Sequence, residues 1–198
     1  MGRTVILDNG HGGIINGVYQ TAGKRSPNWD QGILYEGMFN RWVVNRIIEK
    51  LDRIKIPYYH ISPEYTDVTL ETRTNRADRI YEANRNVWIL SVHANAGGGT
   101  GIEGFTTIGE TASDPICDII LRNFETALPH IVKRYDRADG DRDKEKDFHI
   151  LKKPKAPAVL IECGFMDHRT DYAMLWNEEY VKTLVDSLVI SIGELYNQ

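Results

Sequence analysis

The sequence predicts an α/β fold, with a mostly parallel but mixed central sheet of about six strands flanked by helices on both faces. Short apolar or β-branched runs alternate with longer segments of helical periodicity, which is the pattern of a helix-covered sheet. Two of the short runs, at residues 87–90 and 158–161, are apolar without interruption, as expected for strands buried on both faces. With 198 residues, 41% of them hydrophobic, the chain is long enough for one domain with its own core and short for two.

The individual elements follow from turn residues and from apolar stripes. The expected strands are residues 4–8, 56–62, 87–93, 102–108, 148–151 and 158–163. The expected helices carry apolar side chains that recur every three or four residues. The four stripes are Phe39, Val43, Ile47 and Leu51; Leu70, Ala77 and Ile80; Ile116, Ile120 and Phe124; and Val181, Leu184, Leu188 and Ile192. Residues 12–35, rich in Gly, Asn and Ser, and residues 136–147, rich in charge, are expected to be loops.

Composition excludes several classes of protein. Lys and Arg number 24 against 28 Asp and Glu, a net charge of −4, so the basic surplus of a nucleic-acid binder is missing. No stretch approaches the ~20 apolar residues of a membrane helix. The first residues run directly into a strand, so we expect synthesis in the cytoplasm without a signal peptide. The two cysteines, Cys117 and Cys163, are too few and too far apart for a disulfide scaffold or a thiolate zinc site.

Polar residues follow three of the predicted strands. His11 comes shortly after strand 4–8, His93 follows the apolar run 87–90, and Glu162 follows the run 158–161. In open α/β sheets, ligands bind in the crevice at the carboxyl ends of the strands. We therefore expect these side chains to meet at one site.

The residue types in this set suit a catalytic zinc ion. Such an ion takes three protein ligands, commonly two His and one carboxylate, and a further carboxylate can serve as general base. Glu36 is the candidate third ligand, because it lies three and seven residues before Phe39 and Val43 on one face of a predicted helix. Spacing alone leaves open that His11 and His93 are ordinary hydrogen-bonded histidines, since neither lies in a short histidine signature.

Four segments, taken together and in order, resemble the zinc-dependent N-acetylmuramoyl-L-alanine amidases that have an α/β catalytic domain of about this length. The segments are residues 6–13 (ILDNGHGG), Glu36 with Asn40, residues 91–96 (SVHANA) and residues 157–166 (PAVLIECGFM). Residues 171–196 also resemble the closing helices of that family. The sequence departs from the family pattern at Asn9, where Pro or Ala is frequent, and at residues 167–168, where Ser-Asn is common.

The resemblance implies a function and a site. His11, Glu36 and His93 would bind one zinc ion, and Glu162 would be the catalytic carboxylate. The substrate would be peptidoglycan, cut at the amide between the lactyl group of N-acetylmuramic acid and L-alanine. Residues 1–198 would form a single catalytic domain without a separate cell-wall-binding domain, and a phage endolysin that reaches the wall after release is one role consistent with this.

Three further residues are candidates for binding substrate. Trp29, in the loop 12–35, could stack on sugar or peptide or belong to an inserted surface loop. Arg73 could contact a carboxylate of the stem peptide, although a structural salt bridge is the simpler interpretation. Asn95 lies two residues after His93 at the same strand end. His149 could lie behind the metal ligands, whereas His60, His130 and His168 match no motif of the family.

Two other functions remain open on the sequence. One is a zinc peptidase that cuts within the stem peptide of peptidoglycan. The other is a non-catalytic wall-binding module in which zinc is only structural; Glu162 argues against it, since a structural site has no use for an uncoordinated carboxylate. The sequence makes no prediction of the oligomeric state.

Overall fold

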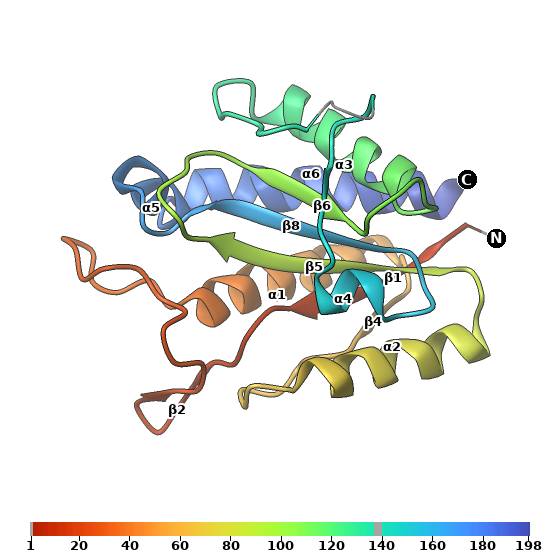
Figure 1. The fold of residues 1–198 in the computed structure, drawn as a ribbon, viewed down its shortest axis with the longest axis horizontal. Helices are drawn as coiled ribbons and strands as arrows, with labels where there is room; N and C mark the ends of the chain where they lie inside the picture. Colours follow the sequence, from red (N-terminus) through yellow and green to blue (C-terminus); the bar gives the residue numbers. More distant parts are fainter. Residues whose placement is uncertain (1, 137–139) are drawn as a thin grey trace.

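A six-stranded sheet with the order β4-β1-β5-β8-β6-β7 forms the centre of the structure, a computed structural model that describes residues 2–136 and 140–198 (Figure 1). The strands are β1 Thr4–Asn9, β4 Tyr58–His60, β5 Val87–Asn95, β6 Glu103–Thr106, β7 Lys144–Glu145 and β8 Ala158–Phe165. Strands β4, β1, β5 and β8 are parallel, β6 runs antiparallel to β8, and β7 runs parallel to β6. The sheet is therefore mixed and mostly parallel.

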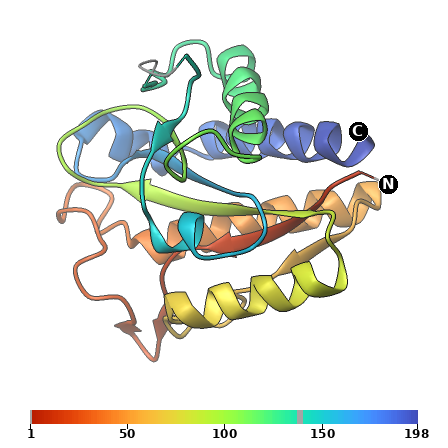
Figure 2. The ribbon, with the colours of Figure 1, turned by 45° about the vertical axis from the view of Figure 1, so that its right-hand side comes forward.

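Helices cover both faces of this sheet. They are α1 Glu36–Ile54, α2 Leu70–Ala83, α3 Asp114–Ala127, α4 His149–Lys152, α5 Arg169–Leu175 and α6 Glu178–Asn197. Apolar residues of α1, α3 and α6 share one buried cluster with the sheet, and residues of α2 and α4 share a second. Figures 1 and 2 show α1 and α6 on one side of the strands and α2 on the other. The predicted fold class is confirmed.

The alternation of side chains along each strand decides which face carries the polar residues. In β1, Val5 and Leu7 belong to the cluster with α1 and α6, whereas Ile6 belongs to the cluster with α2 and α4. Because successive side chains point to opposite faces, Asp8 points to the α2 and α4 side with Ile6. The same count places Ser91 and His93 with Ile89 on β5, and Glu162 with Leu160 on β8. The polar strand ends therefore share one face of the sheet.

One predicted strand, residues 148–151, is wrong. This segment contains the short helix α4, in which the Leu151 and Lys152 amides both donate to the Phe148 carbonyl. Ile150 and Leu151 are neighbours in the sequence and are both buried in the cluster with α2, whereas a strand would point them to opposite faces. A four-residue apolar run cannot be assigned from periodicity alone.

The sixth strand comes instead from the segment 136–147, which was expected to be a loop. It is β7, two charged residues at the edge of the sheet, and residues 137–139 of the same segment lie outside the described residues. Charged residues are typical of edge strands, because they discourage pairing with another chain. The expected loop 12–35 likewise contains a small hairpin, β2 Ile14–Ile15 with β3 Val18–Tyr19.

Of the helices in the described residues, none has the length and apolar character that a membrane span requires.

Candidate metal centre

Three side chains from separate elements meet at the carboxyl ends of β1 and β5. His11 follows β1, His93 lies near the end of β5, and Glu36 is the first residue of α1. The Glu36 Oε1 atom lies 3.1 Å from Nε2 of His11 and 3.0 Å from Nδ1 of His93. One ligand atom from each residue lies within 4.8 Å of the others. The structure thus brings together the three residues that the sequence analysis selected as metal ligands.

Two glycines permit this convergence. A Cβ atom at Gly10 would lie 2.1 Å from the imidazole of His93, and one at Gly37 would lie 1.9 Å from the carbonyl oxygen of Gly12. Only glycine therefore allows the loop after β1 to pass between His93 and the start of α1. The Asn40 side-chain amide fixes that loop by donating to the Gly10 carbonyl at 3.0 Å.

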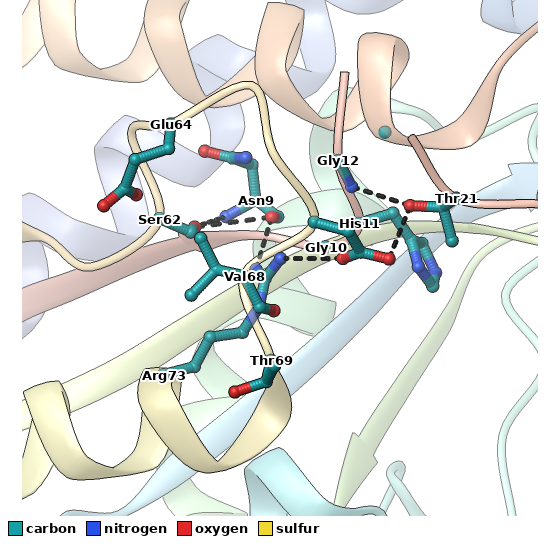
Figure 3. Close-up of polar contacts among 12 residues, drawn as sticks. Asn9, Gly10, His11, Gly12, Thr21, Ser62, Glu64, Val68, Thr69 and Arg73 are labelled. Atoms are coloured by element: carbon teal, nitrogen blue, oxygen red, sulfur yellow. Dashed lines mark hydrogen bonds and ion pairs between the residues drawn. The ribbon is translucent and has the colours of Figure 1, made fainter. Parts of the chain in front are cut away.

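Thr21, just after the hairpin, and the loop before α2 also hold this segment. The Gly12 amide donates to the Thr21 hydroxyl at 2.9 Å, and that hydroxyl donates to Asp67 at 2.7 Å. Figure 3 shows Thr21 beside Gly12, next to His11, with Ser62 and Arg73 gathered around Asn9. Hydrogen bonds that involve Asn40, Thr21 and Asp67 therefore fix the segment that carries His11.

Electrostatics favour an ionised carboxylate at Glu36. Burial of this side chain works to raise its pKa, but the hydrogen bonds and charges of His11 and His93 outweigh burial and hold the pKa of Glu36 well below its usual range. Its Oε2 atom is buried and has no hydrogen-bond partner among the described residues. An ionised carboxylate that has one oxygen beside two imidazole nitrogens and its other oxygen without a partner offers the donor set that a divalent ion such as zinc accepts. The residues present therefore fit the metal that the resemblance implies.

Glu162 lies next to this cluster but differs from it in its surroundings. It is the register partner of His93 on β5 and of Glu103 on β6, so it stands between these two residues in the sheet. Burial, and then the charges of Glu36 and Glu103, raise the pKa of Glu162 well above its usual range, while the charge of Lys24 acts in the opposite direction. Its Oε2 atom is buried without a hydrogen-bond partner among the described residues.

A cavity of about 900 Å³ opens over these residues. His11, Glu36, His93 and Glu162 all line it. Its walls come from the segment before α1, from the start of α2 and from α4, and they include Thr21, Lys24, Leu70, Phe148 and His149. The volume lies within the range of small-molecule and cofactor sites. The cluster is therefore accessible to a ligand.

The three residues predicted to bind substrate have different surroundings. Asn95 lines the cavity and donates to Glu103 Oε2 at 2.6 Å. Arg73 also lines it but is only 2% exposed, and its guanidinium is engaged by Asp8 Oδ1 at 2.5 Å and by the carbonyls of Asn9 and Val68. This arrangement matches the structural salt bridge considered for Arg73 from the sequence.

Trp29 is not among the described residues that line the cavity. Its ring packs edge-on against Tyr172 of α5, with 4.9 Å between the centroids, and the guanidinium of Arg169 lies over it. Trp29 is therefore part of the contact between the loop 12–35 and α5.

Sequence reasoning missed the residues that support the cluster from behind. Ser91 Oγ lies 3.1 Å from His93 Nε2 and donates to Asp8 Oδ2 at 2.7 Å. Burial works to raise the pKa of Asp8, but the charge of Arg73 and the hydrogen bond from Ser91 outweigh burial and hold that pKa below its usual range. Both Asp8 and Ser91 lie in segments that carry the resemblance, so the motifs contained the signal, but their contact depends on the pairing of β1 with β5.

Comparisons with known proteins bear on the family and the fold. The family model described as N-acetylmuramoyl-L-alanine amidase matches residues 5–194. The chain is similar to the N-acetylmuramoyl-L-alanine amidase CwlM of Bacillus licheniformis, at 26% identity over 98% of this chain and 68% of the relative. It is also similar to the endolysin of Bacillus phage SPP1, at 26% identity over 100% of this chain and 67% of the relative.

Among solved structures, the fold is similar to the crystal structure of N-acetylmuramoyl-L-alanine amidase from Clostridium difficile 630. The TM-score is 0.77 at 22% identity, over 100% of this chain and 98% of that chain. At this identity the likeness concerns the fold, and it matches the mixed sheet described above.

Proposed function

Since this chain belongs to the N-acetylmuramoyl-L-alanine amidase family, we propose that it hydrolyses the amide between N-acetylmuramic acid and L-alanine in peptidoglycan, with one zinc ion as cofactor. The observation that carries the proposal is the position of the Glu36 carboxylate, 3.1 Å from His11 and 3.0 Å from His93, in a cavity that Glu162 also lines. Two imidazoles and a carboxylate are a common ligand set of catalytic zinc.

His11, Glu36 and His93 would hold the ion in this proposal. The chemistry that zinc supplies in such a site is Lewis acidity, toward the scissile carbonyl and toward a water molecule. The protein keeps the three ligands ready for it: the loop after β1 fixes His11, the first turn of α1 fixes Glu36, and β5 fixes His93. Glu36 and His93, at the start of a long helix and on a strand, are held more precisely than ligands on free loops. The loop of His11 is held by the hydrogen bonds of Gly10 with Asn40 and of Gly12 with Thr21.

Glu162 would move the proton. Its unpartnered Oε2 can accept a proton from the attacking water and return it to the nitrogen of the leaving L-alanine. A raised pKa suits this task, because a more basic carboxylate takes up the proton more readily and still releases it to an amine. Asn95, which lines the cavity and is partly exposed, is the predicted substrate-binding residue that we retain. Arg73 is buried in its ion pair with Asp8, and Trp29 packs against Tyr172.

The similarity to a phage endolysin supports degradation of the cell wall as the setting of this activity. Peptidoglycan is the partner that the proposal requires. As part of this proposal, residues 1–198 form a single catalytic domain.

Digestion of purified peptidoglycan, followed by mass spectrometry, tests the proposal. We expect new amino groups on L-alanine and intact stem peptides released from the glycan. New termini inside the peptide would instead identify a zinc peptidase, and no cleavage by the zinc-loaded protein would favour a binding module. Glu162→Gln is the matched control, since it should bind the metal without cutting.

A further inference from the structure

A chain of buried hydrogen bonds leads away from the side of His93 that is remote from Glu36. Nε2 of His93 lies 3.1 Å from the Ser91 hydroxyl, and that hydroxyl donates to Asp8 Oδ2 at 2.7 Å. Ser91 is 0% exposed and Asp8 is 1% exposed, so water does not compete for these bonds. The hydrogen-bonding groups of the protein alone therefore decide which atom donates and which accepts in each of these bonds.

The direction is set at Asp8. Its other oxygen, Oδ1, accepts from Arg73 Nη1 at 2.5 Å and from the Ser62 hydroxyl at 2.9 Å. An aspartate that pairs with a guanidinium and accepts on both oxygens is ionised and can only accept. The single proton of the Ser91 hydroxyl must then go to Asp8, so toward His93 the Ser91 oxygen can only accept.

This arrangement places a proton on Nε2 of His93. A histidine that binds a metal ion is neutral and carries one N–H, so in that state the lone pair is on Nδ1. Nδ1 is the atom that faces Glu36 Oε1 at 3.0 Å. A lone pair and a carboxylate oxygen repel each other at this separation unless a proton or a metal ion lies between them.

We propose that Asp8 and Ser91 are positioning residues that hold His93 in its Nε2–H form, so that Nδ1 is the atom that binds the metal. This inference rests on the metal site of the proposed function. It adds a chain of hydrogen bonds that orients His93 and runs through Ser91 and Asp8 to Arg73 on α2. Partners of this kind fix the ring and the tautomer of a ligating histidine and raise its basicity.

The chain offers a matched pair of variants. Ser91 and Ser62 are both buried serines, and both hydroxyls donate to Asp8, but only Ser91 contacts His93. We expect Ser91→Ala to weaken zinc binding by ~10–100-fold, the usual cost of removing the partner of a ligating histidine. Ser62→Ala should bind zinc within a few-fold of the unaltered protein. Competition with a chelator of known affinity measures both, and circular dichroism melting shows that both variants fold.

Asp8→Asn should be at least as damaging, through a different cause. Arg73 and Ser62 both donate to the position of Oδ1, so the asparagine oxygen would occupy that position and its NH₂ group would face Ser91. The Ser91 hydroxyl would then donate to Nε2 of His93, and the proton of the neutral ring would move to Nδ1. A wrong tautomer of this kind disables a histidine without moving it.

Nitrogen NMR of the zinc-loaded protein gives a direct readout that needs no variant. The proposal expects a protonated Nε2 and a metal-bound Nδ1 for His93. A metal-bound Nε2, or equal zinc affinities for Ser91→Ala, Ser62→Ala and the unaltered protein, would overturn it. Failure to bind zinc at all would overturn both this inference and the metal site. A protein that binds zinc as expected but does not cut peptidoglycan would overturn the proposed function alone.

Discussion

Glu36 and Glu162 line the same cavity, yet their surroundings oppose each other. Glu36 lies between two imidazoles that hold its pKa well below the usual range against the effect of burial. For Glu162, burial and the charges of Glu36 and Glu103 raise the pKa well above that range. Under the proposed function, these opposite pKa shifts suit two roles, with Glu36 as an anionic metal ligand and Glu162 as a proton acceptor.

The difference follows from the elements that carry the two glutamates. Glu36 lies at the start of a helix and contacts His11 in the loop after β1 and His93 on β5. Glu162 lies on a strand beside His93 and lines the cavity. Proximity to the cluster alone would make both glutamates candidate ligands. The contacts, not the distance along the sheet, distinguish them.

The largest effect is expected from Glu36→Gln. An amide is a poor ligand for zinc and cannot neutralise the ion, so zinc affinity should fall by more than the ~10–100-fold that the loss of an outer partner costs. Turnover of peptidoglycan should be lost with the metal. Zinc content after dialysis and the rate of peptide release measure the two effects, and full zinc content in this variant would remove Glu36 from the ligand set.

Glu162→Gln should separate the two roles. The variant is expected to keep zinc but to lose ~10²–10⁴-fold in kcat, the usual contribution of a general base. A parallel loss of zinc would mean that Glu162 is a ligand, and retained turnover would place the base elsewhere.

A pH profile sharpens the comparison further. A general base must be ionised, so kcat/KM falls as the pH drops through the pKa of Glu162. Burial is the largest cause of the rise in that pKa and acts with or without the metal, so the acid limb should lie above that of an ordinary glutamate, whose pKa is ~4.3.

The charge of Lys24 acts against the rise in the pKa of Glu162. Its charge lowers the pKa of Glu162, so Lys24→Gln should move the acid limb to higher pH, by less than about one unit for an exposed charge. Lys182→Gln on α6, remote from the cavity lining, is the control and should leave the profile in place. An acid limb that does not move in Lys24→Gln would contradict the electrostatic account of Glu162.

The smallest effect on catalysis is expected at Trp29. Because its ring packs against Tyr172 and does not line the cavity, Trp29→Ala should leave KM unchanged. The free energy of unfolding should fall by about 1–3 kcal/mol, less than for a fully buried tryptophan. Denaturant unfolding measures this, and a raised KM at unchanged stability would instead return Trp29 to the substrate groove.

The sequence predicted the parts of the molecule that local patterns encode. Strands β1, β5 and β8 are apolar runs, and α1, α2, α3 and α6 carry apolar stripes, so their existence and the convergence of His11, His93 and Glu162 followed from position alone. Glu36 followed from helical spacing. The family motifs placed these four residues in one site.

What the sequence did not reveal depends on contacts between distant segments. The edge strand β7 has two charged residues and no strand pattern, and α4 was mistaken for a strand because a short apolar run suits both. The partners of Trp29 and Arg73 lie more than sixty residues away along the chain, at Tyr172 and Asp8. Pairing of β1 with β5, which no local pattern predicts, creates the contact of Ser91 with Asp8.

An anomalous difference map, recorded at the zinc edge from crystals of the zinc-loaded protein, is the most direct test. We expect one peak bound by His11 Nε2, His93 Nδ1 and a Glu36 oxygen at ~2.0–2.2 Å, the usual lengths for these ligands. Glu162 should lie beside the ion without binding it. A peak elsewhere in the molecule, or one that Glu162 binds in place of Glu36, would contradict the division of roles between the two glutamates.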